Sequence, residues 1–263
     1  MKQLNREQKI HYILRIASAM CFIGHGAFGI ITKEIWCNYF AVFGIGRSTA
    51  YTLMPYLGSI DILLGISILF YPTRAAAGWL VMWGTVTALC RPLSGEPFAE
   101  FIERAGNFGA PLALLVLSGG FKRNLKEWFI KITPNYSPSA NTFRQLEICL
   151  RIAVFLLMAG HGWLNLLEKK SLVAQYTSLG FSNTTITAHV VGIIEIVAAF
   201  MLLTKPFRPV VFAFFAWKMV SELFYPHWEL FEWIERGGSY GCLLALWLTL
   251  KRTPVRVYHA AMG

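Results

Sequence analysis

The chain contains few charged residues and little acid. Only 14% of its 263 residues are charged, against roughly 25% in an average soluble domain. Asp61 is the sole aspartate. A soluble domain of this length needs a more polar surface than this composition supplies. The shortage of charge therefore excludes an ordinary soluble fold.

Motifs for several kinds of chemistry are also missing. Five cysteines in so long a chain exclude a disulfide-rich scaffold, and no Cys-x-x-Cys pair provides a thioredoxin-type dithiol. The sequence has no glycine-rich phosphate loop, nucleophile elbow or paired-metal motif. One disulfide among Cys37, Cys90 and Cys242 stays open, beside the simpler expectation that they are small buried apolar residues.

Hydrophobic residues dominate the composition. They make up 56% of the chain, which excludes disorder, and the mean hydropathy is +0.50. The formal net charge is +10. Basic patches that bind nucleic acid lie on soluble, polar folds, so we expect no nucleic-acid partner. The composition predicts an all-α polytopic membrane protein whose partner is membrane lipid.

Eight apolar segments are candidates for transmembrane helices, because a span needs about 20 apolar residues or somewhat fewer where the bilayer thins. The fourth and the last are short. The eight predicted segments are 11–31, 53–71, 75–91, 105–120, 145–166, 186–204, 209–225 and 237–250.

The second half of the chain repeats the first. An Arg, a Gly-His-Gly, an acid and a Glu-Arg recur in the same order at an offset that drifts only from 136 to 132. The matched pairs are Leu14-Arg15-Ile16-Ala17 with Leu150-Arg151-Ile152-Ala153, Gly24-His25-Gly26 with Gly160-His161-Gly162, Asp61 with Glu195, and Glu103-Arg104 with Glu235-Arg236.

This duplication predicts the architecture. Residues 1–131 form the first four-helix repeat and residues 132–263 the second. An even number of helices returns the chain to its starting side, so the halves run parallel. We therefore expect eight transmembrane helices arranged as two four-helix bundles side by side.

The second helix of each repeat carries a recognisable pattern. It reads Gly58-x-x-Asp61-Ile62 and Gly192-x-x-Glu195-Ile196, and in each case an apolar stretch and a basic turn follow. In this pattern the chain resembles the DoxX-like family of four-helix membrane proteins, here as a tandem pair. The resemblance implies a membrane subunit like those of thiosulfate:quinone oxidoreductases, a partner of redox proteins, or an accessory factor for other membrane proteins.

Lysine and arginine predict the orientation. With the N-terminus in the cytoplasm, 14 basic residues fall on inner loops and tails and seven on outer loops and helix ends. Cytoplasmic loops carry the excess of Lys and Arg, so both termini are expected in the cytoplasm. We predict an integral protein of the bacterial inner (plasma) membrane.

The repeated polar residues are the candidate site, since an ionised group inside a bilayer has to face the bundle interior and find a partner. This topology places a His–acid–Glu–Arg cluster in the outer half of each bundle. The candidate catalytic residues are Asp61 and Glu195. The candidate ligand-binding residues are His25, His161, Arg91, Glu103, Arg104, Glu222, Glu235 and Arg236.

Three interpretations of these residues stay open. They can be structural, with hydrogen bonds and ion pairs that set the helix register. They can form a pocket in each bundle, or one bundle can be active and the other degenerate. Haem ligation by His25 or His161 is chemically possible, but no spacing requires it. No metal site is predicted, because no two candidate ligands share an i,i+3 or i,i+4 face.

Two further segments alternate acids with bulky aromatics at helical spacing, residues 96–103 and 227–235. Each is predicted to be a short amphipathic helix at the outer interface, either an anchor, which we favour, or a lid over the bundle.

Two functions are compatible with the sequence. The first is a redox-linked membrane subunit that binds a quinone in an outer-half pocket, where His25 or His161 bonds a carbonyl oxygen and Asp61 or Glu195 exchanges protons. Its electrons come from a separate redox partner protein. The second is a non-enzymatic accessory or small-solute transport protein.

Overall fold

The computed structural model describes residues 4–134, 137–225 and 230–250. Within these ranges the chain is helical and contains no β-strand beyond one isolated bridge between Thr73 and Lys131. Eight longer helices of this described part fall on the eight predicted segments. They are α1 (Arg6–Ile30), α3 (Arg47–Phe70), α4 (Arg74–Leu93), α6 (Ala105–Leu117), α7 (Ala140–Leu166), α9 (Thr184–Thr204), α10 (Arg208–Ser221) and α12 (Gly237–Thr249).

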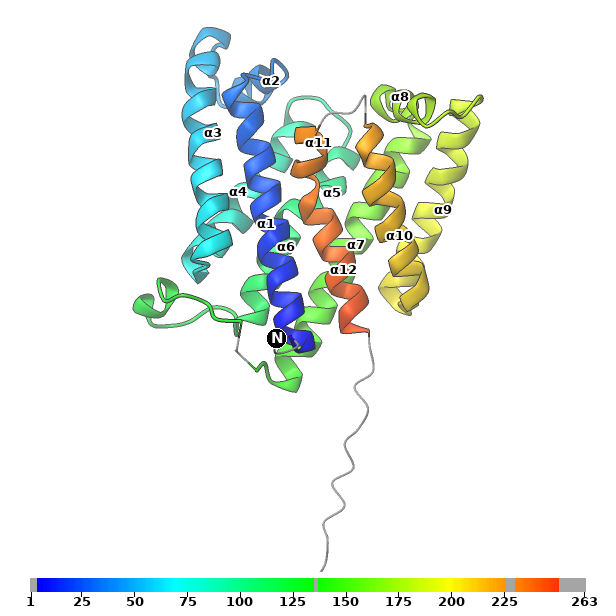
Figure 1. Ribbon diagram of the computed structural model, residues 1–263. Coiled ribbons are helices and arrows are strands. Elements are labelled where there is room, and N and C mark those ends of the chain that lie inside the picture. Colours follow the sequence, from blue (N-terminus) through cyan, green and yellow to red (C-terminus); the bar gives the residue numbers. More distant parts are fainter. Residues whose placement is uncertain (1–3, 135–136, 226–229, 251–263) are drawn as a thin grey trace, which may run out of the picture.

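Shorter elements connect the longer helices. The α-helices are α2 (Trp36–Ala41), α5 (Ala99–Glu103), α8 (Lys170–Ser178) and α11 (Leu230–Glu235), and the 3-10 helices are η1 (Leu125–Trp128) and η2 (Glu222–Phe224). In Figure 1, α2 and α8 lie at the end of the molecule opposite the start of α1 and the end of α12. Both ends of the helical region therefore lie on one side.

Side-chain caps explain where several helices begin. Asn5 forms a capping box with Gln8 at the start of α1. Thr73 accepts a hydrogen bond from the Ala76 amide at 3.1 Å, and Ser139 accepts one from the Thr142 amide at 3.1 Å. Each cap satisfies a backbone N–H that has no partner inside its helix.

Four helices are long and apolar enough to cross a membrane, namely α1, α3, α7 and α9. The others are shorter or less apolar. For example, the 13 residues of α6 extend only about 20 Å at 1.5 Å per residue, less than the ~30 Å of a bilayer core. The structure thus supports an all-helical membrane protein, and the predicted total of eight spans goes beyond these four.

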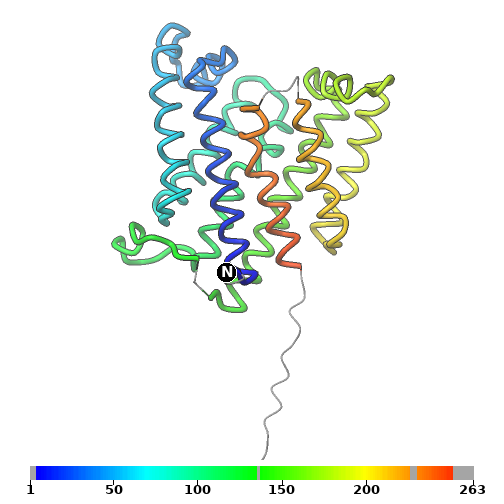
Figure 2. Tube along the Cα trace, viewed as in Figure 1, coloured from blue at the N-terminus to red at the C-terminus, as the bar shows by residue number. Residues whose placement is uncertain are grey.

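The two halves do not pack as two separate bundles. The first and last long helices of both halves, α1, α6, α7 and α12, form one central group with a shared buried core. Helix α3 packs on α1, α9 on α7, α4 on α6 and α10 on α12, so these four flank the centre (Figures 1 and 2). Leu14 and Leu246, from different halves, belong to the same fully buried core. Packing the inner faces of the two halves against each other removes both faces from contact with lipid.

Glycines allow the closest helix contacts. A Cβ on Gly58 of α3 would lie 2.4 Å from the carbonyl oxygen of Gly26 on α1, and a Cβ on Gly192 would lie 2.7 Å from that of Gly162. Missing side chains let these backbones touch, as in other membrane helix pairs. The glycines beside His25 and His161 therefore serve helix packing.

The short helices α5 and α11 take part in the contact between the halves, which the predicted anchor or lid roles did not include. Helix α5 packs on α7 and α11 packs on α1, so each half places a short helix against the first helix of the other. Glu100 and Glu232 are only 2% and 7% exposed. Their acids pair with cations inside the protein, and this pairing draws both segments inward. His227 and its neighbours lie outside the described residues.

We predict that Gly58→Ala lowers the free energy of unfolding by about 1–3 kcal/mol, because the added methyl group forces α1 and α3 apart. Thermal unfolding in detergent measures this loss. Gly46→Ala is the matched control, since a Cβ there meets no atom within 4 Å. Equal stability of the two variants would contradict the role given to the glycine contact.

Candidate functional site

Each half of the protein contains a hydrogen-bonded histidine–acid pair. The Nδ1 atom of His25 on α1 lies 2.7 Å from Oδ2 of Asp61 on α3, and Nδ1 of His161 on α7 lies 2.6 Å from Oε2 of Glu195 on α9. The glycine contacts described above bring each helix pair close enough for this bond. The repeated polar residues are therefore partnered as the sequence predicted.

The first pair opens into a cavity of about 630 Å³. The His25 side chain is 18% exposed, whereas Asp61 beneath it is 1% exposed. The His25 ring also packs on Trp36 of α2, with ring centroids 4.6 Å apart. Tyr39 and Trp83 line the same cavity. Aromatic walls with a few polar groups are typical of small-molecule sites.

The carboxylate determines how His25 can act. An ionised Asp61 can only accept, so Nδ1–H of the neutral ring donates to it. This tautomer leaves a lone pair on Nε2, and Nε2 makes no hydrogen bond within the described part of the chain. Such a nitrogen can take a proton from a bound hydroxyl, and in the imidazolium form it can donate to a carbonyl oxygen.

Ion pairs fix the cavity wall on its other side. The Arg91 guanidinium lies 2.9 Å from Glu96 and 3.3 Å from Glu100, and the Tyr39 hydroxyl donates to Glu96 at 2.6 Å. Lys169, from the second half, lies 2.7 Å from Glu100. The cavity therefore depends on residues of both halves.

A network of buried charges joins the halves. Glu103 accepts from Arg104 at 2.8 Å and from Arg236 of the other half at 3.1 Å. Lys33 of the first half pairs with Glu232 of the second, and Lys169 of the second half pairs with Glu100 of the first in the matching way. Burial alone would raise the pKa of Glu103, but Arg104 and Arg236 outweigh it and hold that pKa well below its usual range. The carboxylate stays ionised and the pairing stays intact at neutral pH.

The second pair is enclosed. Asn165 donates to Glu195 at 3.2 Å, and the Tyr176 hydroxyl donates to Asn165 at 2.8 Å. The side chains of His161 and Glu195 are 5% and 1% exposed. No cavity comparable to the first lies beside them in the part of the chain that the structure describes. This half is closed by packing and hydrogen bonds.

The predicted site residues thus separate into two groups. The cavity of the first half is lined by five of them: His25, Asp61, Arg91, Arg104 and Glu235. The other five lie in the inter-half network or the closed pair: Glu103, Glu222, Arg236, His161 and Glu195.

Sequence reasoning missed two aromatic residues of the cavity and the buried Lys218. Trp36 and Tyr39 lie on the short helix α2, in a segment between two predicted spans to which the sequence assigned no function, although its aromatic residues were a signal. Lys218 is a single charged residue within an apolar run, and this isolated charge was the signal in the sequence that pointed to it.

Cysteine and metal chemistry find little support in the geometry. All five cysteines are free, so Cys37, Cys90 and Cys242 form no disulfide. No group of three or more His, Cys, Asp or Glu side chains with metal-binding geometry occurs among the described residues.

Comparison with known protein families shows a match to part of the chain. The DoxX family model matches residues 146–228, which run from α7 to just beyond η2. No curated protein and no solved structure matches the chain. The match and the long apolar helices indicate an integral membrane protein. The DoxX-like resemblance found in the sequence is thus confirmed, with residues 146–228 as the matched part of the chain.

Proposed function

We propose that the protein is a redox-linked, DoxX-like membrane subunit that binds a quinone in the cavity of the first half. The observation that carries the proposal is the His25–Asp61 pair, whose histidine faces the cavity. A volume of about 630 Å³ lies within the ~300–1,000 Å³ common for ligand pockets. Trp36 and Trp83 offer flat apolar walls for a quinone ring.

The residues of the cavity suit proton exchange with such a ring. Quinone reduction consumes two electrons and two protons, and a separate redox partner supplies the electrons. His25 Nε2 hydrogen-bonds a quinone oxygen, and Asp61 orients the imidazole and stabilises its protonated form. Arg91 and Arg104 are held by Glu96 and Glu100, so a neutral ligand leaves the ion pairs of the wall intact.

We further infer that the two halves are tandem four-helix repeats, residues 1–131 and 132–263, with eight spans in all. Matching backbone features support this. Thr32 and Glu168, 136 residues apart, both adopt φ of 53°, and Gly44 and Gly180, at the same offset, adopt φ of 71° and 86°. Short spans such as α6 reach the interface where the bilayer thins locally.

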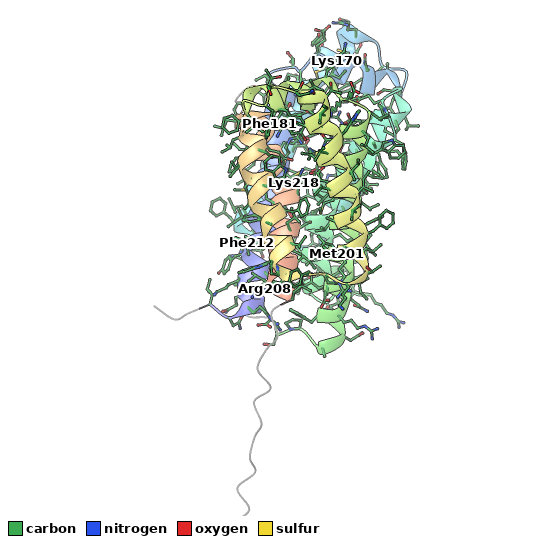
Figure 3. The ribbon with its side chains drawn as sticks, turned by 90° about the vertical axis from the view of Figure 1, so that its right-hand side faces the viewer. Lys170, Phe181, Met201, Arg208, Phe212 and Lys218 are labelled. Carbon is green, nitrogen blue, oxygen red and sulfur yellow. The ribbon has the colours of Figure 1, made fainter. Side chains whose placement is uncertain are left out.

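The orientation follows from charge. Figure 3 places Arg208 near the end where α1 begins and α12 ends, and Lys170 at the opposite end. Together with the excess of basic residues predicted on the terminal side, this supports cytoplasmic termini in a bacterial inner membrane.

We expect a green fluorescent protein fused after residue 263 to fluoresce in cells, and an alkaline phosphatase fused at the same point to be inactive. Fluorescence and phosphatase activity of intact cells measure the two outcomes. The reverse result would place the C-terminus on the outer side of the membrane and would reverse the predicted orientation of the cavity.

Protein purified from native membrane in mild detergent should retain quinone, detected by solvent extraction and absorbance. His25→Phe keeps the ring stacked on Trp36 but removes the hydrogen bond, so quinone affinity should fall about tenfold, or about 1.4 kcal/mol. His161→Phe is the matched control and should retain quinone. A wild-type preparation without quinone, and inert toward quinol, would favour the accessory or small-solute transport function.

The two acids should separate binding from scaffold roles. Asp61→Asn removes the charge that orients His25 and should weaken binding of the quinone menadione about tenfold. Quenching of tryptophan fluorescence by menadione measures this affinity. Glu195→Gln should lower the thermal midpoint and leave menadione affinity unchanged, because Glu195 lines no cavity. If both variants lose stability and keep affinity, both pairs are structural.

A further inference from the structure

The two halves differ at two matched positions in the region of their third long helices. Lys218 of α10 and Glu222, the first residue of η2, match Gly84 and Ala88 of α4 at the offset of 134 that also relates Glu195 to Asp61. Ala88 lines the cavity, and a Cβ on Gly84 would lie 3.3 Å from the Asn107 carbonyl oxygen. Gly84 thus lets α4 pack closely on α6, and the small side chain of Ala88 leaves space in the cavity that His25 and Asp61 also line.

Lys218 and Glu222 fill the matched region of the second half. Their charged groups lie 2.5 Å apart, and their side chains are 3% and 1% exposed. Ala88, which matches Glu222, lines the cavity together with His25 and Asp61. The matched position of the second half therefore places the Lys218–Glu222 pair on the side of His161 and Glu195.

Lys218 lies at a depth where an unpaired charge would cost free energy. Figure 3 shows it between the two ends of the helical region, away from both interfaces. An ammonium group at such a depth needs a partner inside the protein. Glu222 is that partner, and Arg236 lies 3.7 Å from the same carboxylate. The charges of this buried pair are therefore compensated by neighbouring opposite charges.

We propose that Lys218 and Glu222 close a second ligand site and so restrict the protein to one ligand per chain. The Lys218 side chain occupies the space that a ligand occupies in the first half, and Glu222 neutralises it. This inference rests on the proposed function only for the identity of the ligand; the closure itself is a property of packing.

Removing the pair should open the site. Lys218→Gly with Glu222→Ala restores the small residues of α4 and removes both charges together. Menadione binding, measured by isothermal titration calorimetry, should rise from one to two equivalents per chain. The matched control, Lys218→Met with Glu222→Gln, keeps the volume without the charge and should stay at one. A folded opening variant that still binds one equivalent would overturn the proposal.

Transplanting the pair should close the first site. Gly84→Lys with Ala88→Glu places the same groups on α4, where Arg104 corresponds to Arg236. Menadione binding should disappear, and labelling of Cys90, which lines the cavity, by N-ethylmaleimide should slow at least tenfold. Met82→Ala with Val86→Ala, at the same spacing on the exposed face of α4, is the control and should keep both properties.

The labelling experiment separates the two proposals. If the wild-type protein binds no menadione, the quinone function fails, and slower labelling of Cys90 in the transplanted variant still supports closure by the Lys–Glu pair. If that variant is folded and Cys90 reacts at the wild-type rate, the closure proposal fails. This decision holds even where the opening variant does not fold.

Discussion

The structure depends on one constraint, that a charge withdrawn from water must find its partner inside the protein. Lys33 and Lys169, at matching positions after the first helix of each half, each reach an acid on the short helix of the other half. Arg236 reaches Glu103 in the same way. These pairs place α11 against α1 and α5 against α7. The halves therefore form one unit around a shared centre rather than two neighbouring bundles.

The same constraint produces the asymmetry between the halves. Both contain a histidine–acid pair positioned by glycine contacts, so the local framework is equivalent. Where α4 carries small residues, a cavity remains and His25 can be reached. Where α10 carries Lys218, its charge requires Glu222, and the two side chains fill the space together. In the proposed closure, two matched positions thus separate an open site from a closed one.

Much of the local structure was predictable because it depends on periodicity, capping and repetition. The eight predicted apolar segments coincide with eight longer helices in the described residues. The sequence predicted only that His25 and Asp61 belong to one polar cluster, and the structure shows the hydrogen bond between them. The contacts of α5 and α11 with the other half were not predicted, because alternating acids and aromatics look alike on a membrane interface and on an inter-half contact.

The sequence by itself determined the membrane class, the helix positions, the DoxX-like pattern and the recurrence of polar residues, since each depends on residues close together in the chain. Only the tertiary structure decided which half keeps a cavity and how the halves interlock. Those properties depend on contacts between residues more than a hundred positions apart, such as Lys33 with Glu232. Side-chain volume and charge compensation at such contacts can be judged only when the helices have been placed together.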